Sequence, residues 1–182
     1  LESERAKTLR HASNELNKEK TELKKYRRQE LLALRRVPTE IAIERNTWFH
    51  LGINSSEQFI YCLRRILDPV KEHVDNNFNP LPAEYIEEFR PIRAQINDLM
   101  QQTESQISTC RFENYRETLT LADQCKDELS VIRKKHIDRI QQSKDNSKLQ
   151  VSLVYLNLLQ ESQQLLSNMR HQLRAAKKFI DN

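Results

Sequence analysis

Apolar residues recur every seven positions near the end of the chain, and this pattern predicts a long amphipathic helix over residues 147–181. Leu159, Leu166, Leu173 and Ile180 carry the repeat. Other apolar side chains fill the flanking positions: Tyr155, Leu158, Leu165, Met169 and Ala176. The resulting stripe is wide enough for two neighbouring helices to cover it. At 1.5 Å per residue the helix would be about 50 Å long, so we expect the other helices to pack around it.

The first predicted helix covers residues 1–36 and has a thin apolar stripe at Leu9, Leu16 and Leu23. It ends before Pro38, because the residue that precedes a proline is pushed out of the helical region of backbone conformation. A thin stripe buries little surface, so the first half of this helix is expected to make fewer contacts than its second half.

Residues 39–79 are predicted to form a kinked pair of helices. Gly52 offers a C-terminal stop, so the helix breaks or bends there. Asp68 followed by Pro69 suits an N-cap and first-turn pair, so a second helix begins there or the first one kinks. Breaks or bends at Gly52 and at Pro69 would interrupt an otherwise continuous helical stripe.

The remaining segments complete an all-α fold in a single domain, residues 1–182. Residues 76–82 (NNFNPLP) have the composition of a loop. Helical stripes follow over residues 82–108 and 111–146, and the short polar connection at 143–147 makes consecutive helices antiparallel neighbours. The pattern therefore predicts an antiparallel bundle of five or six long helices.

Composition narrows the classes of protein that this chain can belong to. It has a single glycine and five prolines, which leaves too few turn-forming residues for strand-rich folds, phosphate-binding glycine loops or Rossmann fingerprints. Three cysteines without a CxxC motif argue for reduced thiols in a cytoplasmic setting: Cys62, Cys110 and Cys125.

No apolar run approaches the roughly 18 residues that a membrane-spanning helix needs, and no signal peptide is present. The chain is therefore expected to be soluble as it stands. It begins at Leu1 without an initiator methionine, so we also expect it to be a fragment of a longer protein.

Positive charge is concentrated at the two ends of the sequence. Residues 1–36 contain 11 Lys and Arg against 6 Asp and Glu, and residues 147–182 contain 5 against 2. The first helix offers a candidate basic surface: Lys20, Lys24, Lys25, Arg27 and Arg28. Such a surface could bind acidic lipid headgroups, nucleic acid or an acidic partner. The other interpretation, a solvated helix face, is favoured by base rates.

The candidate chemistry of the sequence is sparse. None of the five histidines belongs to an HExxH motif, and no nucleophile has an evident base beside it. His136 lies on the apolar side of its predicted helix, which indicates a hydrogen-bonded core histidine. We therefore predict that the protein is not an enzyme.

Two acidic sets have the i, i+4 spacing that can offer oxygen ligands to a divalent metal or iron. One is Asp68 with Glu72, followed by Asp75, and the other is Asp123 with Asp127. At about 100° per residue, the first set lies opposite the apolar stripe of its helix. This position favours a solvated acidic face, and the metal-site interpretation stays open beside it.

Two blocks of the sequence resemble the PhoU-like helical domains of bacterial inorganic phosphate transporters, in the sodium/phosphate cotransporter-related or inorganic phosphate transporter families. They are residues 56–81 (SEQFIYCLRRILDPVKEHVDNNFNPL) and residues 155–179 (YLNLLQESQQLLSNMRHQLRAAKKF). The resemblance implies an all-α fold of three-helix-bundle units on the cytoplasmic side of the inner membrane. It also implies metal binding by acidic motifs, whose nearest matches here are DPVKEHVD (Asp68, Glu72, Asp75) and DQCKD (Asp123, Asp127).

The resemblance implies a non-enzymatic regulatory domain of a phosphate transport system. Its partner would be the membrane phosphate permease portion of the same protein or a second copy in a homo-oligomer. The basic ends would fit a position against an anionic membrane surface. Two alternatives stay open: a helical interaction scaffold unrelated to phosphate, and nucleic-acid or anionic-membrane binding through residues 18–28. Nucleic-acid binding rests on the basic ridge alone.

Overall fold

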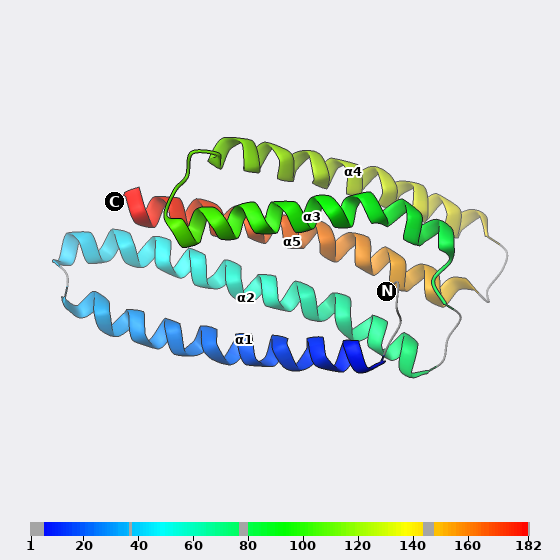
Figure 1. The fold of residues 1–182 in the computed structure, drawn as a ribbon, viewed down its shortest axis with the longest axis horizontal. Helices are drawn as coiled ribbons and strands as arrows, with labels where there is room; N and C mark the ends of the chain where they lie inside the picture. Colours follow the sequence, from blue (N-terminus) through cyan, green and yellow to red (C-terminus); the bar gives the residue numbers. More distant parts are fainter. Residues whose placement is uncertain (1–5, 37, 77–79, 144–147, 182) are drawn as a thin grey trace.

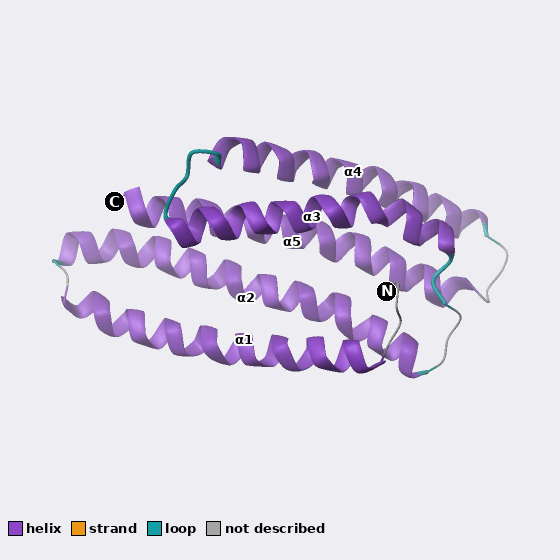
Figure 2. Ribbon diagram, in the orientation of Figure 1, coloured by secondary structure: helices purple, strands orange, loops and turns teal. Residues whose placement is uncertain are grey.

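The computed structural model describes residues 6–36, 38–76, 80–143 and 148–181. Within these ranges every regular element is a helix and there is no strand, which confirms the all-α helical bundle (Figures 1 and 2). The elements are α1 (Ala6–Ala33), the short 3-10 helix η1 (Leu34–Arg36), α2 (Thr39–Asp75), α3 (Ala83–Thr109), α4 (Tyr115–Gln142) and α5 (Leu149–Asp181). The predicted loops at 76–82 and 143–147 lie partly outside the described residues.

Helix α5 is the centre of the bundle and packs against α2, α3 and α4 (Figure 1). Leu159, Leu166 and Leu173 are buried, as the seven-residue repeat predicts, whereas Ile180 in the last turn is 48% exposed. Helices α3 and α4 also pack on each other, so they form a three-helix group with α5. Helix α1 lies on the outer side of α2. The long C-terminal stripe is therefore covered by helices on more than one side.

Helix α2 is one continuous helix, so the predicted pair of helices over residues 39–79 is wrong. Gly52 lies inside α2 instead of ending it. A Cβ atom at this position would lie 3.7 Å from the Cβ of Ala175 on α5, so the glycine marks a close approach between the two helices. The packing of a long helix on α5 outweighs the local helix-ending preference of one glycine.

Pro69 also lies inside α2. A proline has no amide hydrogen, so the carbonyl of Arg65, four residues earlier, lacks its usual helical donor. Asn157 of α5 fills this role, since its Nδ2 donates a hydrogen bond of 2.7 Å to that carbonyl oxygen. Pro69 removes one hydrogen bond within α2, and the carbonyl that it leaves free forms a hydrogen bond between α2 and α5.

Helix α4 begins at Tyr115, four residues later than predicted. The difference arises at the end of α3, where Cys110 adopts a left-handed conformation with φ of 54°. The amide of Cys110 donates to the carbonyl of Ile107, and the amide of Arg111 donates to the carbonyl of Gln106. These two bonds form a Schellman motif, in which glycine usually occupies the left-handed position. The following residues reverse the chain direction before α4 starts.

Candidate functional site

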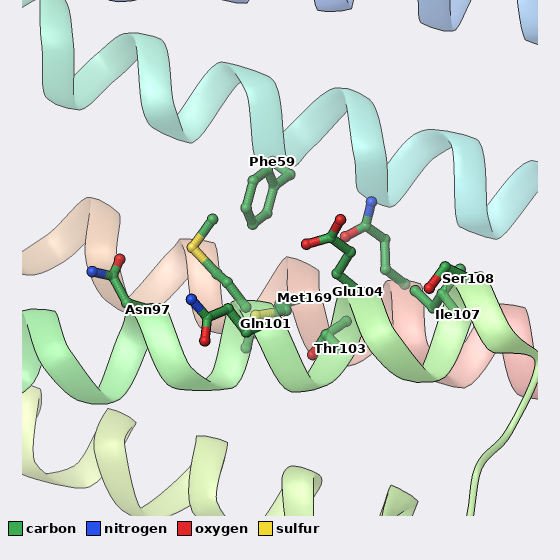
Figure 3. Close-up of a pocket in the computed structure, with 10 residues that line it drawn as sticks. Phe59, Asn97, Gln101, Thr103, Glu104, Ile107, Ser108 and Met169 are labelled. Carbon is green, nitrogen blue, oxygen red and sulfur yellow. The ribbon is translucent and has the colours of Figure 1, made fainter.

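A groove lies between α2 and α3, with α5 as its floor (Figure 3). Both helices pack on α5, but in the described ranges no Cα atom of α2 comes within 8 Å of a Cα atom of α3. The resulting hollow has a volume of about 550 Å³. Phe59 points from α2 toward α3, and Glu104 extends from α3 into the space between the helices.

The lining of this groove is apolar with amide groups around it. The apolar side chains include both methionines of the protein: Phe59, Met100, Ile107 and Met169. Three amide side chains border them: Asn97, Gln101 and Gln172. Glu104 is the one ionisable lining residue, and it is exposed to solvent. Methionine side chains are flexible and polarisable, so the groove can adapt to an apolar surface.

A second hollow of about 250 Å³ continues the groove along α2 and α5 and shares Ile107 and Gln172 with the first. Large aromatic side chains line it, including the single tryptophan of the protein: Trp48, Phe49 and Phe179. From Trp48 to Phe59 the groove follows about three turns of α2, or about 16 Å. It has the length and chemistry of a surface that receives the apolar face of a helix.

A partly buried polar cluster joins α3, α4 and α5 away from the groove. Glu88 of α3 accepts two hydrogen bonds of 2.9 Å from Arg139, one of 3.1 Å from Lys135 and one of 3.2 Å from the hydroxyl of Tyr155. Burial alone would raise the pKa of Glu88, but the hydrogen bonds from Arg139 and Lys135 outweigh this effect and hold the pKa below its ordinary value. Glu88 is therefore ionised and fully engaged at neutral pH.

His136 lies beside this cluster and is 0% exposed. Its ring packs edge-on against Tyr85 and Tyr155, with centroid distances of 4.8 Å, and the two tyrosine rings stack at 4.7 Å. Burial lowers the pKa of His136, so the ring is neutral, and its Nε2 donates to the carbonyl of Ser152 at 2.9 Å. This arrangement confirms the predicted hydrogen-bonded core histidine. The cluster holds the three helices together.

The acidic residues predicted as metal ligands lie in two different settings. Asp68, Glu72 and Asp75 are exposed on α2, as expected for a solvated acidic face, and Asp75 pairs with Lys71 at 3.3 Å. On α4, Asp123 forms an ion pair of 2.5 Å with Arg170 of α5, and Asp127 is exposed. Over the ranges that the structure describes, no three His, Cys, Asp or Glu side chains are close enough together to hold a metal ion. Binding of a metal by either set remains a prediction.

The predicted basic surface lies on α1, and three of its five side chains have partners. Lys25 pairs with a glutamate one turn earlier on the same helix, at 2.6 Å. Arg27 pairs with Glu57 of α2 at 3.6 Å, and Lys20 lies over the ring of Tyr61. The other two are exposed and form no ion pair within the described part of the chain: Lys24 and Arg28. The available positive charge is therefore smaller than the sequence indicates.

Sequence analysis does not reveal the groove. Helical periodicity identifies Phe59 and Ile107 as members of apolar stripes, but a stripe does not say whether two helices that share a neighbour also touch each other. The small residues Gly52 and Ala175 mark where α2 and α5 approach closely. These two residues locate the α2–α5 side of the groove, but they do not indicate where α3 lies.

No helix in the described ranges has both the length and the apolar composition needed to cross a membrane. No protein-family model, no curated protein and no solved structure matches this chain. The function is therefore argued from the residues and the geometry described above.

Proposed function

We propose that this chain is a PhoU-like, non-enzymatic regulatory domain of an inorganic phosphate transport system. It belongs to a longer membrane transporter, lies on the cytoplasmic side of the inner membrane and acts on the phosphate permease. The observation that carries the proposal is the position of the two sequence blocks that resemble PhoU-like domains. The first block lies on α2 as far as Asp75, and the second lies on α5; these two helices pack most extensively on each other.

Both blocks also reach the groove. Phe59 belongs to the first block, and Met169 and Gln172 belong to the second. The two blocks therefore contribute one wall and the floor of the groove, while α3 contributes the other wall. A regulatory domain of this kind changes a permease by contacting one of its conformations more strongly than another.

The state of the buried polar groups supports a role without catalysis. Glu88 is ion-paired, and burial keeps His136 neutral. Burial also raises the pKa of Tyr155, so its hydroxyl stays protonated and donates to Glu88. These groups hold the helices together, and none of them lines the groove.

The proposal is tested by removing the domain from the transport protein and measuring phosphate uptake by cells at limiting and at abundant phosphate. We expect the dependence of uptake on external phosphate to change. Leu166→Asp should reproduce the deletion, because it places a charge in the fully buried centre of α5. Leu153→Asp is the matched control, since Leu153 is on the same helix and 51% exposed. Unchanged uptake at every phosphate concentration after deletion would refute the proposal.

A second candidate function is a helical interaction scaffold unrelated to phosphate, which the open apolar groove also favours. The same uptake measurement separates the two functions. A scaffold would bind its partner through the groove while phosphate uptake remained independent of the domain.

A further inference from the structure

We propose that the groove between α2 and α3 binds an amphipathic helix that carries Lys or Arg beside its apolar face, and that a cytoplasmic segment of the permease supplies this helix. The identity of the partner rests on the proposed function. The chemistry of the bound helix rests on the groove alone.

The shape of the groove suits a helix. Its two hollows follow α2 from Trp48 to Phe59, a distance of about three helical turns. Helix-binding grooves receive apolar side chains spaced at i, i+3, i+4 and i+7 on one face of the ligand. Aromatic rings and the two methionines offer such side chains an adaptable apolar surface.

The charge near Glu104 determines which polar residues the ligand can carry beside its apolar face. Glu104 extends into the space between α2 and α3 (Figure 3), and among the described residues no Lys, Arg or His lines either hollow. Arg45 lies over the ring of Phe179, which lines the second hollow, whereas Glu104 lines the first. A cation beside the apolar face of the bound helix would lie near this carboxylate, whereas an acidic residue in the same place would be repelled. Helices of the opposite charge pattern are thereby disfavoured.

The proposed function provides a source for such a helix. Cytoplasmic segments close to membrane-spanning helices carry an excess of Lys and Arg. A permease therefore presents segments rich in basic residues on the side of the membrane where we place this domain. Their charge is complementary to Glu104.

The binding experiment uses the whole 182-residue chain and a synthetic 18-residue amphipathic peptide with Leu at i, i+3, i+4 and i+7 and Lys on both flanks. Met100 and Met169 are the only methionines, and Trp48 is the only tryptophan. All three residues line the groove. The methyl NMR signals of the two methionines and the fluorescence of Trp48 therefore report directly on binding there. We expect saturable 1:1 binding that shifts both methyl signals and the emission of Trp48.

Charge selectivity is tested with a second peptide in which every Lys is replaced by Glu. We expect its affinity to be at least about ten-fold lower, because several like-charge contacts replace attractive ones. Glu104→Gln should weaken binding of the Lys peptide by about three-fold, the size of one exposed ion pair. Glu84→Gln is the matched control on the same helix, about 30 Å away, and should leave the affinity unchanged.

Site specificity is tested with Gln101→Trp, which fills the groove from its exposed rim. This variant should abolish peptide binding while the circular dichroism spectrum stays unchanged. Equal affinity for the two peptides, or methyl signals that do not move, would overturn the inference. Methyl shifts that depend on protein concentration without peptide, together with a dimer in sedimentation, would also overturn it, because a second copy would then occupy the groove.

The two proposals can fail separately. If uptake depends on the domain but the Lys peptide does not bind, the groove inference fails and the proposed function stands. If the Lys peptide binds selectively but uptake does not depend on the domain, the proposed function fails and the groove retains its preference for a basic amphipathic helix.

Discussion

His136 packs edge-on against the stacked rings of Tyr85 and Tyr155, and its Nε2 donates a hydrogen bond to the carbonyl of Ser152. A proton added to this ring would place a charge in a fully buried site, close to the guanidinium of Arg139. The neutral form is therefore part of the folded structure. Glu88, on the preceding helix α3 but in the same cluster, must stay ionised for its bonds to Arg139.

We predict that the free energy of unfolding falls as the pH drops below about 6.5, the ordinary pKa of histidine. The pKa of His136 is lower in the folded protein, so the unfolded chain takes up the proton first and is stabilised by acid. The stability that His136 contributes is thus fully present above the unfolded-state pKa and is lost below it, by at most about 1.4 kcal/mol per pH unit. Urea unfolding followed by circular dichroism from pH 7.5 to 5 measures this slope.

The control for this prediction is His136→Gln, which removes the titrating ring. The variant should be less stable at pH 7.5, but the slope attributable to His136 should disappear. A second loss of stability is expected at lower pH in both proteins, because the depressed pKa of Glu88 means that its ion pairs are lost as the pH falls through that value. Equal slopes between pH 7.5 and 5 in the two proteins would contradict the assignment to His136.

Cys110 provides a second prediction at the residue scale. Its φ of 54° is unfavourable for any residue with a Cβ atom, whereas glycine adopts it without steric cost. Cys110→Gly should therefore raise the free energy of unfolding by about 1 kcal/mol and the melting temperature by about 2–4 °C. Arg111→Gly, at the next position, should not stabilise the protein. A lower melting temperature for Cys110→Gly would show that the strain is absent.

At the scale of elements, α2 depends on α5 for its continuity. Pro69 leaves the carbonyl of Arg65 without a donor inside α2, and Asn157 of α5 supplies one. The hydrogen bond joins the helices near the end of α2 that carries Val70 in the core. Loss of either partner should therefore affect the contact between the two helices.

A double-mutant cycle tests this interaction. Asn157→Ala should destabilise the protein by about 1 kcal/mol, because it removes the donor to the carbonyl of Arg65. The same substitution should cost less in a Pro69→Ala background, where a main-chain N–H at position 69 can donate to that carbonyl. We expect a coupling energy of about 1 kcal/mol from urea unfolding. Additive effects of the two substitutions would contradict this account.

The elements differ in how far the sequence predicts them. Leu159, Leu166 and Leu173 locate α5 because a repeat sustained over several turns reflects burial along the whole helix. Gly52 and Pro69 are misleading because they are single local signals, each outweighed by the packing of α2 on α5. The position of His136 on an apolar stripe was enough to predict its buried, hydrogen-bonded state.

The candidate site is less predictable than the helices around it. The groove exists because α2 and α3 share α5 without touching, and this relation between helices leaves no periodic signal in either sequence. The ion pair between Arg27 and Glu57 crosses from α1 to α2. Such ion pairs between helices cannot be deduced from the charges of one helix. The sequence of α1 therefore indicates more unpaired Lys and Arg side chains than the structure contains in its described part.

At the scale of the whole molecule, the helices differ in the number of neighbours that hold them. Among the described residues, α1 packs on α2 as its one long neighbour, whereas α5 packs on three long helices. The polar interactions between α1 and α2 are exposed to solvent. An example is the hydrogen bond that Arg64 donates to Asn17. Exposed contacts of this kind add little to stability.

We predict that α1 opens while the rest of the bundle stays folded. Native-state hydrogen exchange should give opening free energies for α1 amides at least about 2 kcal/mol below those of α5 amides, because helices with few buried contacts open locally. The slowest amides of α5 should report global unfolding. Similar values for the middle of both helices would show that the bundle opens as one cooperative unit.

The central position of α5 also has a consequence for folding during translation. Among the described elements, α5 follows all the others in sequence, yet it covers the apolar side of α2. At about 5–20 residues per second, a ribosome needs about 5–20 seconds to add the stretch from Asp75 to Asp181. During that interval the nascent α1–α2 hairpin leaves Cys62 and Val70 uncovered by α5, which makes it a substrate for chaperones that act during translation.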